Sequence, residues 1–268
     1  MVHSVAPEGA QWSQVLDPQG FKWTPGVTPF SSLTIILATW SLYFSGILFL
    51  KFYMRNRPPF ALRTATALHN LFLCGASAAI CVGVVREVYR RATTRGVDEI
   101  FCTADPDSLD GPLSWYLYLY YLTKFYELAD TFILVLKKKP LIFLHWYHHA
   151  IVILMVWSWI HYGIVFSALG TIANTGVHVF MYYYYFRSSL GGRVWFKRYL
   201  TALQIVQFGT SFVLAAPYVY YHFQKGCVGG PAFVGSMLVN FSFLLLFVQF
   251  YKGAYSSRST KTKQVKEL

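Results

Sequence analysis

The chain has 268 residues, of which 55% are hydrophobic and only 13% are charged. Soluble domains carry about 25% charged residues, so this composition excludes an ordinary soluble globular domain. The formal net charge of +12 would suit nucleic acid. However, Lys and Arg fall mainly in the connections between apolar runs, as they do in membrane proteins, and we expect no nucleic-acid partner.

Seven apolar runs are long enough to cross a bilayer, which takes about 20 helical residues. They lie at about 30–50, 65–85, 114–136, 141–162, 164–186, 200–221 and 231–251. The alternating polarity of a membrane β-barrel is absent. We therefore predict an all-α polytopic membrane protein, with seven transmembrane helices in one domain over residues 30–255 and the lipid bilayer as its surroundings.

Two polar segments flank this domain. Residues 1–29 lack the basic start and apolar core of a signal peptide, and residues 256–268 form a basic tail. Lys and Arg are concentrated in the tail and in the connections after the first, third and fifth runs. The positive-inside rule therefore places the C-terminus in the cytosol and the N-terminal segment on the far side of the membrane.

The first two runs and the seventh run carry little obvious chemistry. The first contains no charged residue and no histidine, and we interpret it as a plain anchor. The second holds His69, interpreted as a hydrogen-bonded structural residue, and Cys74 and Cys81, interpreted as packing residues. We assign no chemistry to the seventh run, although it contains four polar residues: Ser236, Asn240, Ser242 and Gln249.

Cys102 and Cys227 lie in the connections at 86–113 and 222–230, which the topology places on the non-cytosolic side. An oxidising compartment there would permit a disulfide between them. The pairing of cysteines does not follow from a sequence, so a disulfide and two free thiols both remain open.

The third run places Lys124, Glu127, Asp130 and Thr131 at helical spacing on neighbouring parts of one face. Charged groups inside an apolar run are costly and suggest a functional site. A buried ion-pair network that orients helices is the alternative interpretation. Lys137–Lys139 follow this run, and two interpretations remain open: they follow the positive-inside rule alone, or they also meet an anionic, phosphate-bearing ligand at the membrane surface.

The fourth, fifth and sixth runs add further polar side chains. His145, His148 and His149 fall within about 100° of arc on one helical face, which packing alone does not explain. The fifth and sixth runs contribute Asn174, His178, Met181, Tyr182, Gln204 and Gln207. Glutamines at this spacing commonly join membrane helices. At about 1.5 Å per residue, the residues Asp130 and Thr131, the three histidines, His178, Gln204 and Gln207 all fall in the cytosolic half of the bilayer, which predicts a polar chamber above an apolar compartment.

This shape suits an amphiphile with an anionic head and a long acyl tail. Three functions could use such a chamber. A di-iron centre needs about eight histidines, and only four lie in the chamber, so we expect no metal. Acyl transfer fits better, with a histidine as the nucleophile because no cysteine lies there. A transporter or receptor with buried charges is the alternative from another class.

Four ordered motifs carry a resemblance to a known family. They are Lys124-x-x-Glu127-x-x-Asp130-Thr131, the histidine box His145-x-x-His148-His149, Asn174-x-x-x-His178-x-x-Met181-Tyr182, and Thr201-x-x-Gln204-x-x-Gln207. From the second run to its end, the chain resembles the very-long-chain fatty acid elongases. The resemblance implies a seven-helix fold in the endoplasmic reticulum membrane, with an acyl tunnel closed at the lumenal end.

The implied reaction is condensation of a long-chain acyl-CoA with malonyl-CoA to 3-oxoacyl-CoA, CoA and CO2, without a metal or cofactor. The resemblance makes His148 the nucleophile and gives His178 a role at the reacting carbonyl, while His145 and His149 orient groups or exchange protons. Asn174, Gln204 and Gln207 would bind the substrates. The groups near them, Lys124, Glu127, Asp130, Thr131, Met181 and Tyr182, would complete the substrate site.

Several expectations are less specific. A 3-oxoacyl-CoA reductase and a dehydratase of the elongation cycle are expected partners, and a homodimer remains open. Trp146, within the histidine box, resembles the residue found there in the family branch that prefers saturated and monounsaturated acyl chains. Lys266 is third from the end, but Lys263 is sixth, so the tail departs from the family's dilysine retrieval signal.

Overall fold

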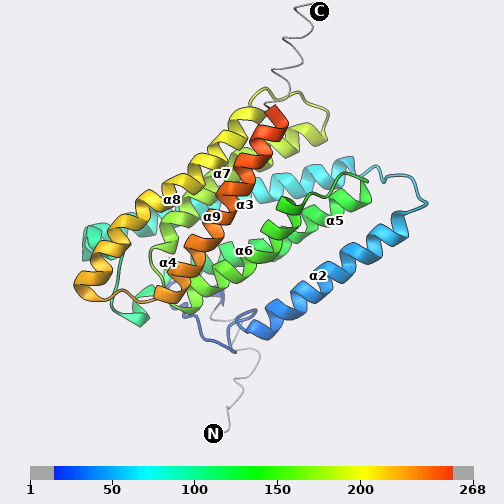
Figure 1. Ribbon diagram of the computed structural model, residues 1–268. Coiled ribbons are helices and arrows are strands. Elements are labelled where there is room, and N and C mark those ends of the chain that lie inside the picture. Colours follow the sequence, from blue (N-terminus) through cyan, green and yellow to red (C-terminus); the bar gives the residue numbers. More distant parts are fainter. Residues whose placement is uncertain (1–14, 256–268) are drawn as a thin grey trace, which may run out of the picture.

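The computed structural model describes residues 15–255, and within this range the chain is helical and contains no strand. The helices are α2 (Leu33–Met54), α3 (Arg63–Arg95), α4 (Pro112–Tyr126), α5 (Leu128–Leu136), α6 (Phe143–His161), α7 (Ser167–Ser189), α8 (Lys197–Lys225) and α9 (Gly230–Tyr255), with two 3-10 helices, η1 (Val97–Ile100) and η2 (Pro106–Leu109) (Figure 1). The predicted all-helical class is confirmed. The predictions for residues 1–14 and 256–268 lie outside the described residues.

Five helices of the described range are long and apolar enough to cross a membrane, namely α2, α3, α6, α8 and α9. They indicate a multi-pass membrane protein. The other two predicted spans are the ones richest in site residues. The third is divided into helices of 15 and 9 residues, and α7 has 23 residues but carries Asn174, His178 and a run of tyrosines. The count of seven spans therefore stays a prediction.

The sequence predicted one continuous helix over 114–136, and the structure interrupts it at Glu127. The Thr123 hydroxyl donates a 2.7 Å hydrogen bond back to the Tyr120 carbonyl. Such side-chain bonds compete with the helical ladder and bend helices. The interruption directs the charged groups of α4 and α5 toward neighbouring helices.

Six helices form a closed ring in which each packs against the next, in the order α3, α7, α8, α9, α6, α4 and back to α3. Helix α5 continues from α4. Helix α2 lies outside this ring and packs against α5 and α6 (Figure 1). Close approach of α3 to α4 requires Gly83, because a Cβ there would lie 2.2 Å from the Tyr116 ring.

The connections gather at two ends of the bundle. We call one the lysine-turn end, after Lys137–Lys139, where the α2–α3 and α5–α6 connections meet through a 3.0 Å hydrogen bond from Phe60 N to Leu136 O. We call the other the disulfide end, because a disulfide there joins Cys102 to Cys227. The sequence had left this pairing open. Cys74 and Cys81 are free thiols.

Ion pairs and turns reinforce the disulfide end. Lys225 Nζ lies 2.8 Å from both Asp98 Oδ2 and Glu99 Oε1. The hydrogen bond from Lys225 lowers the pKa of the Asp98 carboxyl. Gly229 adopts a φ of +80° in the α8–α9 connection, and a Cβ there would lie 2.8 Å from Ile164 Cβ. This close approach brings the α6–α7 and α8–α9 connections together.

The described part of the N-terminal segment also lies at the disulfide end, where it packs against α4. Phe21 is buried and stacks on Tyr118 with ring centroids 5.1 Å apart. Trp115 Nε1 donates a 2.7 Å hydrogen bond to Val15 O, and Tyr118 OH donates one of 3.1 Å to Pro29 O. Residues 15–29 therefore form an ordered cover over this end of the bundle.

Candidate active site

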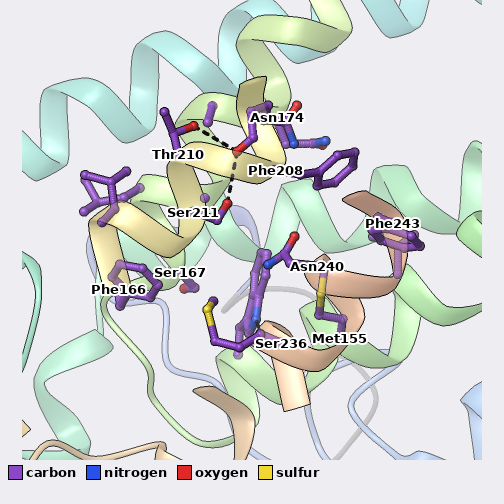
Figure 2. Close-up of a pocket in the computed structure, with 18 of the residues that line it drawn as sticks. Met155, Phe166, Ser167, Asn174, Phe208, Thr210, Ser211, Ser236, Asn240 and Phe243 are labelled. Carbon is purple, nitrogen blue, oxygen red and sulfur yellow. Dashed lines mark hydrogen bonds between the residues drawn. The ribbon is translucent and has the colours of Figure 1, made fainter. Parts of the chain in front are cut away.

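A narrow cavity of about 50 Å³ runs between α4, α6, α7, α8 and α9 (Figure 2). His148, Asn174 and Gln207 line it toward the lysine-turn end, whereas Ile164 and Phe166 line it at the disulfide end. Most of the remaining lining is apolar or aromatic, with Met155, Trp159, Phe208, Leu214, Phe233 and Phe243 among it. The cavity therefore joins a few polar groups to a long apolar passage.

His148 is the one histidine that lines this cavity. Its ring lies 4.9 Å from Phe243 and 5.4 Å from His149, centroid to centroid. No hydrogen bond of the described part of the chain involves its ring nitrogens, and the side chain is partly exposed, whereas His149 and His178 are buried. A neutral imidazole with an available nitrogen facing an apolar passage can act as a nucleophile.

Asn174 is oriented by a side chain that the sequence did not identify. Tyr120 OH donates a 2.7 Å hydrogen bond to Asn174 Oδ1. Because the amide oxygen is engaged, the NH2 group of Asn174 is left to donate. Tyr120, Asn174 and Gln207 line the same cavity as His148, so amide donors lie around the polar part of the passage. Such donors suit a carbonyl oxygen that gains negative charge.

Lys124 and Glu127 form a buried ion pair beside the cavity. Lys124 Nζ lies 2.7 Å from Glu127 Oε1 and 4.2 Å from the centroid of the Tyr120 ring. His178 Nδ1 lies 3.7 Å from the same carboxylate oxygen. Glu127 Oε2 has no hydrogen-bond partner in the described structure. The pair therefore sets the charge around His178, and His178 itself does not line the cavity.

Asp130 joins three helices. Its carboxylate lies 2.7 Å from His69 Nε2 on α3 and accepts a 2.9 Å hydrogen bond from Tyr182 OH on α7. The structural interpretation of His69 is thus confirmed, and its partner is a residue of the predicted site. This network lies outside the cavity lining and holds α3, α5 and α7 in register.

Thr131 lies at the centre of a second network. Its hydroxyl is 2.9 Å from His145 Nε2 and 2.8 Å from Tyr43 OH on α2. The His145 and His149 rings are 4.5 Å apart. The histidine box is therefore connected to α2, which the sequence suggested was a plain anchor.

The remaining predicted residues lie away from the cavity. Gln204 Nε2 is 3.6 Å from Met181 Sδ, a contact between α8 and α7. Trp146 packs against Phe44 and Phe143, with ring centroids 5.8 and 4.8 Å away. Neither pair lines the passage. Of the predicted site residues, only His148, Asn174 and Gln207 do so.

The sequence missed several contributors for recognisable reasons. Tyr120 is one helical turn before Lys124, a spacing that could have identified it. The seventh run, to which the sequence assigned no chemistry, also borders the cavity, because α9 contributes Ser236, Asn240 and Phe243 to its lining. Asn240 lies one turn from Phe243, so both occupy the same face of α9 (Figure 2). Among residues 15–255, no group of three or more His, Cys, Asp or Glu residues is arranged to hold a metal ion.

Comparison with known proteins places these features in a family. The model of the family described as "ELO: GNS1/SUR4 family" matches residues 28–263. A Dictyostelium discoideum protein provisionally named a fatty acid elongase is 43% identical over 256 residues, which cover 94% of this chain and 86% of that protein.

Two further relatives carry related names. Fatty acid elongase sre1 of Dictyostelium discoideum is 35% identical over 251 residues, covering 92% of this chain and 93% of that protein. Very long chain fatty acid elongase 7 of Rattus norvegicus is 34% identical over 260 residues, covering 91% and 88% of the two chains. This chain belongs to the GNS1/SUR4 (ELO) family of fatty acid elongases.

Proposed function

We propose that this protein condenses a long-chain acyl-CoA with malonyl-CoA, giving 3-oxoacyl-CoA, CoA and CO2 by way of an acyl-histidine intermediate. The observation that carries the proposal is the position of His148, which lines the cavity without a hydrogen-bond partner among the described residues, beside Asn174 and Gln207. The names of the relatives support fatty acid elongation as the overall process.

In the first half-reaction, a ring nitrogen of His148 attacks the thioester carbonyl. A carbon–nitrogen bond forms, the carbon–sulfur bond breaks, and CoA leaves as a thiolate that takes up the proton released by the other ring nitrogen of His148. The amide NH2 groups of Asn174 and Gln207 donate hydrogen bonds to the carbonyl oxygen as it gains charge. An acyl-imidazole is itself a good acyl donor, so the enzyme holds an activated chain.

In the second half-reaction, malonyl-CoA loses CO2, and the electron pair of the broken carbon–carbon bond forms an enolate. The enolate carbon attacks the acyl carbonyl, and the bond to His148 breaks. The electron pair returns to the ring nitrogen, and a proton from solvent restores the neutral imidazole. Release of CO2 drives the step, and no metal or cofactor takes part. His178, held beside Glu127 and Lys124, assists at the reacting carbonyl once bound substrate widens the site.

The remaining polar groups would not contact the reacting atoms. They would affect the reaction by supporting the residues that do. Gln204 with Met181, and Asp130 with Tyr182, would support the substrate site from behind its wall. His149 adds a buried imidazole between His145 and His148. The acyl chain would extend along the apolar passage toward the disulfide end, where the tunnel would close.

We further propose that the protein resides in the endoplasmic reticulum membrane, with the lysine-turn end in the cytosol and the disulfide end in the lumen. A disulfide is stable in an oxidising compartment, which supports this orientation. Lys137–Lys139 would then meet the anionic head of CoA at the cytosolic surface. A reductase and a dehydratase would process the 3-oxoacyl product, and a homodimer is compatible with this arrangement.

Intact-protein mass spectrometry tests the mechanism. Purified protein is incubated with a long-chain acyl-CoA and no malonyl-CoA, and we expect an adduct of one acyl group that is absent in His148→Ala. His161→Ala is the matched control, because His161 is on the same helix, stacks on Trp157 and lies outside the cavity. Size-exclusion chromatography and thermal melting confirm that both variants fold.

The outcomes separate the parts of the proposal. An adduct that persists in His148→Ala would assign the nucleophile to another residue. Condensation without any adduct would mean direct attack of the enolate on the bound thioester. Absence of condensation with every acyl-CoA offered would overturn the proposed function.

A further inference from the structure

Helix α2 packs against the ring of helices through a small number of specific contacts. Trp40 Nε1 donates a 2.9 Å hydrogen bond to Ala150 O, and the Phe44 ring packs on Trp146. Between them along α2, Tyr43 is 1% exposed. Much of the rest of the helix is exposed, as expected for a surface that faces lipid. A single buried hydroxyl on a lipid-facing helix needs an explanation, because an unpaired one is costly in an apolar setting.

The Tyr43 hydroxyl is the outer member of a three-residue hydrogen-bonded chain. Tyr43 OH lies 2.8 Å from Thr131 Oγ1, which lies 2.9 Å from His145 Nε2. Thr131 is fully buried. The chain therefore passes from α2 through α5 to the first histidine of the box on α6.

The number of protons available shows which group donates in each of these two hydrogen bonds. If Tyr43 donates to Thr131 and Thr131 donates to His145 Nε2, each hydroxyl proton has an acceptor. If His145 Nε2 donated instead, Thr131 would either donate to Tyr43 or accept from both neighbours. The Tyr43 proton in the first case, and the Thr131 proton in the second, would have no acceptor among the described residues. Buried donors are almost always paired, so the first arrangement is favoured. It requires Nε2 to be an acceptor, and the neutral ring then carries its proton on Nδ1, which has no hydrogen-bond partner in the described structure but is not among its buried unpaired atoms.

We propose that Tyr43 is a positioning residue that fixes the tautomer and orientation of His145 through Thr131. It touches no reacting atom. The His145 ring contacts the His149 ring, which contacts that of His148, with centroids 4.5 and 5.4 Å apart. The tautomer of His145 decides which of its ring nitrogens carries the proton, and thereby the electrostatic surroundings of His149 and His148. The kinetic part of this inference rests on the proposed function, whereas the tautomer does not.

The tautomer is tested by nuclear magnetic resonance on protein labelled with nitrogen-15 histidine, with His145→Gln used to assign the signal. We expect wild-type His145 to show a protonated Nδ1 and an unprotonated Nε2. In Tyr43→Phe, which removes only the hydroxyl, and in Thr131→Val, we expect a mixture of the two tautomers. Thr131→Ser keeps the hydroxyl and should keep the wild-type signal. A wild-type signal in Tyr43→Phe, or a protonated Nε2 in the wild type, would overturn the inference.

Steady-state kinetics supply the second readout. Tyr43→Phe should lower kcat about tenfold, the effect of losing one buried hydrogen bond, with KM for the acyl-CoA unchanged. The double variant Tyr43→Phe/Thr131→Val should be no slower than Thr131→Val alone, because both act through one chain. Trp40→Phe is the matched control, since it removes a different hydrogen bond of α2, the one from Trp40 to Ala150 O on α6. This variant should keep wild-type kcat.

These outcomes distinguish positioning from support of the fold. An equal loss of kcat in Trp40→Phe and Tyr43→Phe would assign the effect to docking of α2, and a rise in KM alone would assign it to substrate binding. Either result overturns a positioning role for Tyr43. If the wild-type protein condenses no acyl-CoA, the proposed function fails, and the tautomer measurement still decides the inference about His145.

Discussion

Lys124 and Glu127 form an ion pair of 2.7 Å in which both side chains are at most 2% exposed. Removing two charges from water is costly, and their attraction offsets this cost only while both are present. Glu127 also has one oxygen without a partner in the described structure and lies near His178. A change in this ion pair should therefore alter both the stability of the fold and the charge around His178.

The first prediction concerns this pair. Lys124→Met should lower the free energy of unfolding by about 3–5 kcal/mol, because it leaves a buried carboxylate without its counterion. The double variant Lys124→Met/Glu127→Leu should recover most of that loss, since it removes both charges. Chemical unfolding in detergent measures the difference. A double variant as unstable as the single one would show that the two charges are not coupled.

The second prediction concerns the disulfide, whose cysteines are 125 residues apart. A bond that closes such a long loop restricts the unfolded chain, and its loss should cost about 2–5 kcal/mol. Cys102→Ser/Cys227→Ser should therefore melt at a lower temperature than the wild type. A reducing agent should lower the wild-type melting temperature and leave that of the variant unchanged. Equal sensitivity of the two proteins to the reducing agent would contradict the prediction.

The third prediction concerns acid. Lys225 donates a hydrogen bond to Asp98 and lowers the pKa of that carboxyl on folding. A carboxyl with a lowered pKa contributes stability above its unfolded pKa, about 3.9, and loses the contribution as pH falls through the folded value. The melting temperature should therefore decline below about pH 4.

The acid effect should be small, because Asp98 is 41% exposed and solvent screens the pair. Exposed pairs contribute at most about 1 kcal/mol. Lys225→Met should reduce the slope of melting temperature against pH. Lys22→Met, which breaks the separate pair with Asp107, serves as a comparison at the same end of the bundle. An unchanged slope in Lys225→Met would show that Asp98 does not contribute.

The fourth prediction concerns chain length. Gly170 lines the cavity near the disulfide end, and a Cβ there would lie 3.7 Å from Trp159. Gly170→Leu should fill part of the passage and shift the products toward shorter acyl chains. Gly176→Leu is the control on the same helix, because a Cβ at Gly176 would contact nothing within 4 Å and the residue does not line the cavity. Chromatography of the products gives the comparison, and identical product lengths would contradict a terminal role for this region.

Much of the fold could be predicted because long apolar runs have few structural solutions in a membrane. The positions of α2, α3, α6, α8 and α9 follow from that rule. The interruption at Glu127 does not, because it depends on the Thr123 hydroxyl and on a carboxylate that meets His178 of α7 only after folding. Helix ends also differ, and α3 continues to Arg95, ten residues beyond its predicted span.

The sequence predicted which helix faces carry the candidate site, but not the contacts of each side chain. Spacing brought His145, His148 and His149 together, and the structure distinguishes them by what each ring contacts. Tyr43 could not be selected in advance, since a tyrosine in an apolar run resembles its many neighbours until a partner is known, whereas the spacing of Tyr120 from Lys124 offered a signal. The part played by Asn240 likewise depends on which face of α9 closes the ring.

The narrowness of the passage has a consequence for selectivity. Its volume of about 50 Å³ is room for only a few water molecules, at about 10–15 Å³ each, and far less than a long acyl chain needs. Under the proposed function, the surrounding helices would have to separate for an acyl chain to enter, and because these helices form a closed ring, a movement at one contact would involve the others. Selection of substrate length would then depend on how easily the ring of helices widens as well as on the residue at the end of the passage. An acyl chain that is too short would remove too little apolar surface from water to keep the helices apart.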